Sequence, residues 1–109
     1  MQYLVEGTGG PGFASSAETI ALLEQAIIPD FDILVRMQSE GKILAGGLPV
    51  GSRAFVFIIE AASNDEADRI VRAIPFWGIL EWKVTPLQSV SARAGIERAN
   101  LAALKAAAR

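Results

Sequence analysis

Two helix-start signals, each placed after a strand-like segment, constrain the fold of this chain more than any other feature. Ser15 and Glu18 in "SSAE" have the spacing of a capping box, and Ser63 and Glu66 in "SNDE" repeat it. In a capping box, the serine hydroxyl and the glutamate carboxylate each bind an otherwise unpaired backbone amide at the start of a helix. The sequence therefore predicts one helix after Ser15 and a second helix after Ser63.

The first of these helices is expected to be long and kinked. Apolar residues recur at helical spacing after the first capping box, at Ile20, Leu23, Ile27, Phe31 and Leu34. This stripe runs across Pro29, which removes one backbone hydrogen bond without displacing the apolar positions. We expect a kinked helix over about residues 16–40 that ends at Gly41.

The segments around the two helices have strand patterns. "QYLVE" (2–6), "KILAGGLP" (42–49), "RAFVFIIEA" (53–61) and "ILEWKVT" (79–85) are the predicted strands. The third of them is apolar on both faces, as is typical of a central strand that is covered on both sides. The helices of this chain can cover one of those sides, and something else must cover the other.

The predicted order is strand, helix, strand, strand, helix, strand, followed by a helical tail. This order indicates an α+β fold of the ferredoxin-like βαββαβ type in residues 1–90, with residues 91–109 as a C-terminal helix that contacts an oligomer partner. Such a sheet has helices on one face, so a second copy is expected to cover the other and complete a dimeric α/β barrel. The mean hydropathy of +0.35, high for 109 residues, favours such a homodimer.

Composition excludes several function classes. A net charge of -2 argues against a dedicated nucleic-acid binder, and no apolar run approaches the roughly 20 residues that cross a membrane. The N-terminus lacks the layout of a signal peptide, so a cytoplasmic protein is expected.

With no cysteine and no histidine, any chemistry must use Asp, Glu, Lys, Arg, Tyr, Ser or Thr, or an outside cofactor. Cations outnumber carboxylates in residues 91–109, which favours docking on an acidic protein surface over DNA.

The element order and the run "AIPFWGILEWKVTPL" (73–87) resemble the dimeric α/β-barrel superfamily, in particular the muconolactone isomerase family and its YCII-related cousins. The pair Glu40-Gly41 after the long helix is similar to the former, and "AGGLP" (45–49) to the latter. The resemblance implies a cofactor-independent isomerase that moves a proton in a small acidic or lactone compound. It also implies oligomers assembled from dimers. The Asp before the proline in YCII-related proteins is replaced here by Ile74.

Two carboxylates are candidate general bases. Glu6 ends the first predicted strand, and Glu24 lies one position from the apolar stripe of the first helix. A partly buried carboxylate has a raised pKa and can remove a proton from carbon. The alternative for both is a solvated surface carboxylate.

Four further residues near the strand ends are candidates for substrate binding. Gly9 and Gly10 expose backbone amides before a helix, where a carboxylate can bind, although "GTGGPG" does not fit a dinucleotide-binding fold. Arg53 opens the central strand and could clamp a carboxylate, whereas ordinary surface pairing is its alternative role. Tyr3 could offer a hydroxyl to a ligand, or it could be a core residue whose hydroxyl reaches a backbone carbonyl.

The aromatic stretch "IPFWGILEW" (74–82) combines two roles. Phe76 and Trp77 lie in a turn after Pro75 and are candidates for a pocket wall, with a structural plug as the alternative. Leu80 and Trp82 share one face of the last strand and are predicted core residues. The charge-rich "NDEADR" (64–69) is interpreted as the exposed first turn of a helix.

Three functions remain open from the sequence. The first is the cofactor-free isomerase, acting on a small anionic or hydrophobic molecule. The second is a non-catalytic protein of the same fold that binds a small ligand or only oligomerises, which the missing histidine favours. The third is a cofactor-free monooxygenase of the same superfamily.

Overall fold

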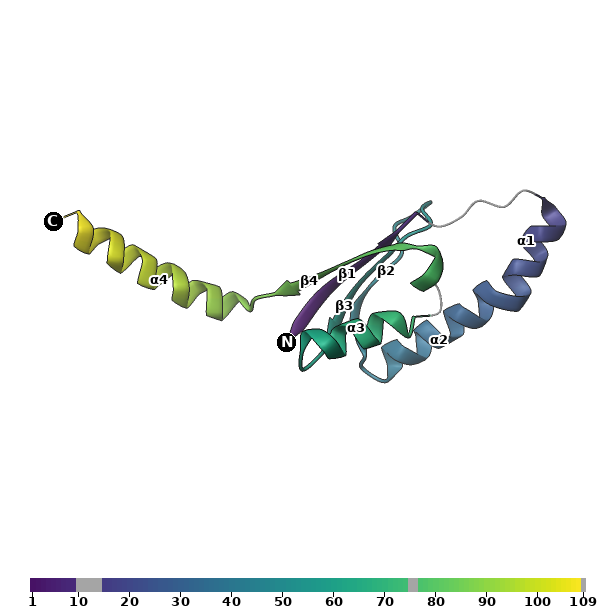
Figure 1. Cartoon of the computed structure of the whole chain (residues 1–109), viewed down its shortest axis with the longest axis horizontal. Helices are drawn as coiled ribbons and strands as arrows, with labels where there is room; N and C mark the ends of the chain where they lie inside the picture. Colours follow the sequence, from purple (N-terminus) through teal and green to yellow (C-terminus); the bar gives the residue numbers. More distant parts are fainter. Residues whose placement is uncertain (10–14, 75–76, 109) are drawn as a thin grey trace.

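The computed structural model describes residues 1–9, 15–74 and 77–108 of the chain. The elements are, in order, β1 (Gln2–Thr8), α1 (Ser16–Leu22), η1 (Leu23–Ile27), α2 (Ile28–Ser39), β2 (Ile43–Gly47), β3 (Phe55–Glu60), α3 (Asn64–Arg72), η2 (Trp77–Ile79), β4 (Glu81–Leu87) and α4 (Val90–Ala107). The four strands form one antiparallel sheet in the order β2-β3-β1-β4, and α2 and α3 lie on the same side of it (Figure 1). The predicted ferredoxin-like βαββαβ fold is confirmed.

Strand β3 is central, as its sequence predicts. Phe55, Phe57 and Ile59 face the helices and are at most 5% exposed. Between them, Val56 is 37% exposed and points to the opposite face of the sheet. We call this opposite side the outer face. Its apolar side chains are the ones that the helices of the same chain leave uncovered.

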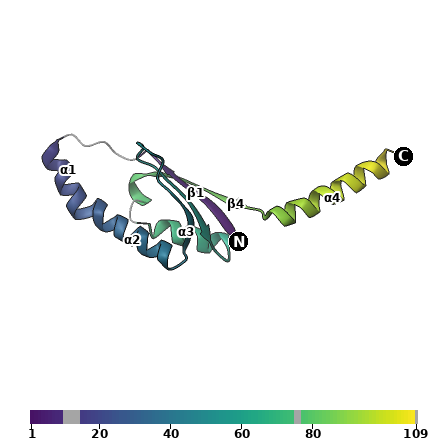
Figure 2. The same ribbon diagram turned by 180° about the vertical axis from the view of Figure 1, so that it is seen from behind.

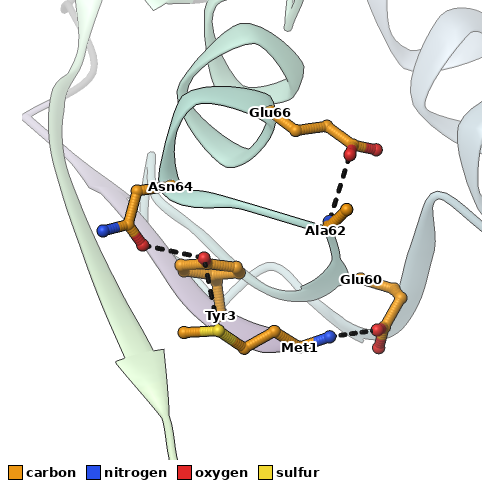
Figure 3. Close-up of polar contacts among 6 residues, drawn as sticks. All are labelled: Met1, Tyr3, Glu60, Ala62, Asn64 and Glu66. Atoms are coloured by element: carbon orange, nitrogen blue, oxygen red, sulfur yellow. Dashed lines mark hydrogen bonds and ion pairs between the residues drawn. The ribbon is translucent and has the colours of Figure 1, made fainter.

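Both predicted serine caps form, at Ser15 and Ser63. The backbone amide of Glu18 donates to Ser15 Oγ at 3.2 Å, and that of Glu66 donates to Ser63 Oγ at 3.1 Å. In the second box, Glu66 Oε2 accepts from the amide of Ala62 at 3.1 Å, one residue before the cap (Figure 3). These bonds satisfy amide groups that have no partner within the helix.

The long helix continues past Pro29 through a widened turn. The π-helical segment η1 precedes α2, and the amide of Ile28 donates to the carbonyl of Leu23, five residues earlier. Pro29 lies in the first turn of α2. A wider turn absorbs the geometry that a proline without an amide imposes, so the apolar stripe persists. The kinked helix is confirmed, and it ends at Ser39 with Glu40 as its cap.

Several other element ends differ from the sequence prediction, and β2 and β3 are both shorter than the strands predicted at 42–49 and 53–61. Strand β1 extends to Thr8 and not only to Glu6, because Gly7 pairs with both Phe55 and Trp82. Helix α3 ends at Arg72, and Pro75 lies outside the described residues. Strand β4 starts later and includes Pro86, which an edge strand tolerates because one side of its backbone needs no partner.

Helix α4 projects away from the rest of the molecule (Figures 1 and 2). No residue of α4 is buried, and the chain extends over 73 × 27 × 22 Å. Its radius of gyration of 19.3 Å exceeds the roughly 13 Å of a compact domain of this length. No helix in the described part of the chain is long and apolar enough to span a membrane.

Candidate functional site

A cavity opens on the helix side of the sheet, between α3 and β4. Its volume is about 380 Å³, within the rough range of 300–1,000 Å³ of small-molecule sites. It is lined by Asp68, Val71, Trp77, Gly78, Leu80, Trp82 and Val84. We call it the tryptophan cavity, because both tryptophans of the chain line it.

The positions of the two indole rings are fixed by β4 and by the turn before it. Trp82 Nε1 donates a hydrogen bond to the carbonyl of Trp77 at 3.0 Å. The Trp82 ring stacks on Phe55, with centroids 6.4 Å apart, and lies directly against Gly7. A β-carbon at Gly7 would come within 2.7 Å of the ring, so the glycine leaves the space that Trp82 occupies. This wall of the cavity is therefore built into the core.

A cation and a carboxylate lie at the edge of the tryptophan cavity. Arg72 Nε donates to Asp68 Oδ2 at 2.8 Å, one helical turn apart on α3. The Arg72 guanidinium also lies 4.6 Å from the ring centroid of Trp77. Because the Asp68 contact uses one of its five donors, a guanidinium in this position can bind a second carboxylate. The side chains of Arg72 and Asp68 are 57% and 61% exposed, so an incoming anion can reach them.

Two other hollows fit a functional site less well. One of them has a volume of about 430 Å³ and lies between α2 and α3. Its lining residues belong to these two helices or to the turns just after them, and none belongs to a strand. The other, between α2 and β2, has a volume of about 110 Å³ and is lined mostly by apolar side chains. The tryptophan cavity alone among the three combines aromatic walls with a carboxylate, Asp68, whose partner Arg72 lies over one of those walls.

Three predicted site residues lie at the end of the sheet near the tryptophan cavity. Gly7 pairs with Trp82 and Phe55, so the neighbouring Glu6, Gly9 and Arg53 belong to this end. The side chain of Glu6 alternates with those of Val5 and Gly7 and points to the outer face, where its strand neighbours are Val56 and Lys83. Gly9 has a positive φ of 78° and is exposed. Arg53 is exposed in the turn before β3.

The remaining predicted residues are not brought together with these. Tyr3 lies toward the other end of β1 and is 1% exposed; its hydroxyl donates to Asn64 Oδ1 at 2.8 Å and lies 3.7 Å from Met1 Sδ (Figure 3). Glu24 is exposed in η1. Trp77 lines the tryptophan cavity and is 38% exposed. Gly10 and Phe76 lie outside the described residues.

Asp68 and Arg72 are residues that the sequence reasoning did not select. Their spacing of four, one turn before a proline-aromatic turn, is the signal that could have identified them. Asp30, also not selected, is a half-buried carboxylate in the first turn of α2, and its burial raises the pKa of that carboxyl. Within the described residues, no three His, Cys, Asp or Glu side chains gather as a metal site would require.

Comparison with known proteins agrees with this fold. A crystal structure of muconolactone isomerase superposes with a TM-score of 0.63 at 18% identity, covering 82% of this chain and 90% of the other. 5-Chloro-2-hydroxyhydroquinone dehydrochlorinase from Burkholderia phenoliruptrix AC1100, solved in complex with 2,5-dihydroxybenzoquinone, gives 0.59 at 21% identity, covering 84% and 98%. No protein of curated function matches the sequence significantly. The family model described as muconolactone delta-isomerase matches residues 14–92, most of the chain. The chain therefore belongs to the muconolactone delta-isomerase family.

Proposed function

We propose that this protein is a cofactor-independent isomerase that moves a proton within a small acidic or lactone compound bound in the tryptophan cavity. The observation that carries the proposal is the position of Arg72, which lies over Trp77 and beside Asp68 at the edge of an aromatic cavity. Membership of the muconolactone delta-isomerase family supports the reaction class.

The aromatic walls and Arg72 account for substrate binding. A flat, unsaturated ring packs favourably against the indole of Trp77 or Trp82. The substrate carboxylate then binds the terminal amino groups of Arg72, while Arg72 Nε keeps its bond to Asp68. The cavity selects in this way for a small molecule with one apolar face and one anionic end.

Asp68 is the carboxylate that lines this cavity, and we assign proton transfer to it. Its carboxylate removes a proton from one carbon of the substrate, and the resulting acid returns the proton to another carbon, so that no external oxidant or reductant is needed. The contact with Arg72 orients the carboxylate. Glu6 and Glu24 stay alternative bases. Neither lines this cavity, since Glu6 points to the outer face and Glu24 is exposed in η1.

The test is turnover of a small unsaturated lactone with a carboxylate side chain, followed by its ultraviolet absorbance. Asp68→Asn should lower kcat by roughly 100-fold or more, as expected for the loss of a general base, and should change KM little. Glu6→Gln and Glu24→Gln are the comparison variants, and each should retain most of the activity. A loss confined to Glu6→Gln or Glu24→Gln would transfer the role of base to that residue.

Ligand binding without turnover is the second candidate, favoured by the exposure of Asp68. A carboxylate that is 61% exposed is well solvated, and solvation weakens a general base that must act on carbon. In that case the same lactone would raise the melting temperature of the protein while its absorbance stayed constant. Turnover by the unsubstituted chain would decide against this candidate.

The outer face of the sheet supports association with a second copy. Leu4, Val56 and Ile58 place apolar side chains on it, and α2 and α3 lie on the other side (Figure 1). Pairing of two such faces would remove this apolar surface from water, which is the main favourable term in association. Glu6 and Lys83, which face each other across β1 and β4, would then lie in the interface.

A further inference from the structure

The apolar stripe of the long helix runs beyond the sheet that covers it. Leu34, at one end of the stripe, is 6% exposed and belongs to the core. At the other end, Ile20 is 56% exposed and Leu23 is 36% exposed. Neither α1 nor η1 contains a buried residue, and α1 projects past the sheet (Figure 1). The described part of the subunit therefore leaves this end of the stripe without cover.

Helix α4 carries a second uncovered apolar stripe. Val90, Leu101 and Leu104 fall on one helical face and are 87%, 53% and 60% exposed. The cations of this helix flank that face, with Arg93 on one side and Arg98 and Lys105 on the other. An amphipathic helix of this kind gains stability when its apolar face packs on another surface.

The two stripes have complementary charges. Residues 16–32, from α1 into α2, contain four carboxylates and neither lysine nor arginine. In α4, three cations stand against the single carboxylate of Glu97. Contact between the two helices would therefore pair opposite charges around an apolar seam, a combination that fixes both orientation and choice of partner.

The two stripes of one chain cannot meet each other. Helices α1 and α4 lie at opposite ends of a molecule 73 Å long (Figures 1 and 2). We propose that α4 of one subunit packs on the apolar stripe of α1 and η1 in a second copy of this chain. An 18-residue helix is about 27 Å long, so it can follow the stripe for several turns. The family model ends at residue 92, so nearly all of α4 lies beyond that match, whereas α1 and η1 lie within it.

Cysteine cross-linking tests this contact, because the chain has no cysteine of its own. One full-length copy carries Leu23→Cys and a differently tagged full-length copy carries Leu101→Cys, and the two are expressed together and oxidised mildly. Both sites are exposed, so the substitutions leave the core intact. The proposal predicts a disulfide-linked pair of the two tags at ten times or more the yield of a control in which Ala99→Cys replaces Leu101→Cys.

Ala99 provides the matched control, because it lies on the opposite side of α4 from Leu101. Reversal of charge gives a second readout. Arg98→Glu should reduce the cross-link several-fold, and Arg98→Glu combined with Glu24→Arg in the other copy should restore it. Equal yields for Leu101→Cys and Ala99→Cys would overturn the proposal. So would the absence of any cross-link in a protein that binds vesicles of anionic phospholipid through α4.

Discussion

Gly7 illustrates how the absence of one side chain shapes the candidate site. It has an ordinary strand conformation, yet the Trp82 ring occupies the place of a β-carbon. Gly7→Ala must displace that ring and weaken its hydrogen bond to the Trp77 carbonyl, and we expect a loss of about 1–3 kcal/mol in the free energy of unfolding. Urea denaturation followed by circular dichroism measures this loss.

Gly47→Ala is the control, because nothing lies within 4 Å of a β-carbon there and no positive φ requires glycine. It should change the stability by less than about 0.5 kcal/mol. Equal stabilities of the two variants would show that Trp82 does not hold its position against Gly7.

Asp30 links stability to pH. Burial raises the pKa of its carboxyl above the ordinary value of 3.8, so the folded state disfavours the ionised form. Ionised Asp30 thus lowers the stability at neutral pH, and this penalty disappears as the pH falls through the raised folded value toward 3.8. Asp30→Asn should stabilise the protein at neutral pH, and the gain should shrink on acidification. Urea denaturation of both proteins across this pH range measures the difference, and a gain independent of pH would contradict the account.

At the scale of elements, the two serine caps accept the same kind of hydrogen bond but have different consequences. Helix α3 buries Ala67 and Val71, whereas α1 buries nothing. Ser63→Ala should therefore reduce the global free energy of unfolding by about 1 kcal/mol, because α3 unfolds with the core. Ser15→Ala should leave the global value nearly unchanged and speed amide hydrogen exchange only in α1. Equal losses of global stability in the two variants would show that α1 is coupled to the core.

The elements could be predicted from the sequence where local chemistry determines them. Capping residues and the apolar stripes gave both helix starts and all four strands, since each signal acts within a few residues. The π-helical turn before Pro29 could not be predicted, because an apolar helical stripe that contains a proline is compatible with several kinds of kink. Strand β1 continues through Gly7 because of contacts with Phe55 and Trp82, which are distant in sequence.

The candidate site was predicted in part. Trp77 was selected because it follows a proline in an aromatic turn, a local signal. Asp68 lay in a stretch interpreted as an exposed helical turn, and only the fold shows that α3 brings it and Arg72 to the cavity beside β4. Glu6, Gly9 and Arg53 reach the same end of the sheet, and their assigned roles stay predictions.

At the scale of the whole molecule, we expect two copies to associate through the outer faces of their sheets. Val56 lies on this face in the central strand, so Val56→Asp places a charge where two sheets would meet. Light scattering should show that this variant has about half the mass of the unsubstituted assembly, as expected when each sheet pair separates. Val50→Asp, at a fully exposed position between β2 and β3, is the control and should keep the full mass. An unchanged mass for Val56→Asp would exclude the outer face as an interface.

Recognition of a small anion in the tryptophan cavity is the central claim, and intrinsic fluorescence tests it directly because both tryptophans of the chain line this cavity. Titration with an unsaturated lactone carboxylate should quench the emission and give the Kd. Arg72→Gln should weaken binding roughly 10- to 100-fold, the equivalent of about 1.5–3 kcal/mol for a hydrogen bond to a charged group. Arg98→Gln on α4 should leave the Kd unchanged. Equal Kd values for the two variants, or no quenching at all, would contradict the account.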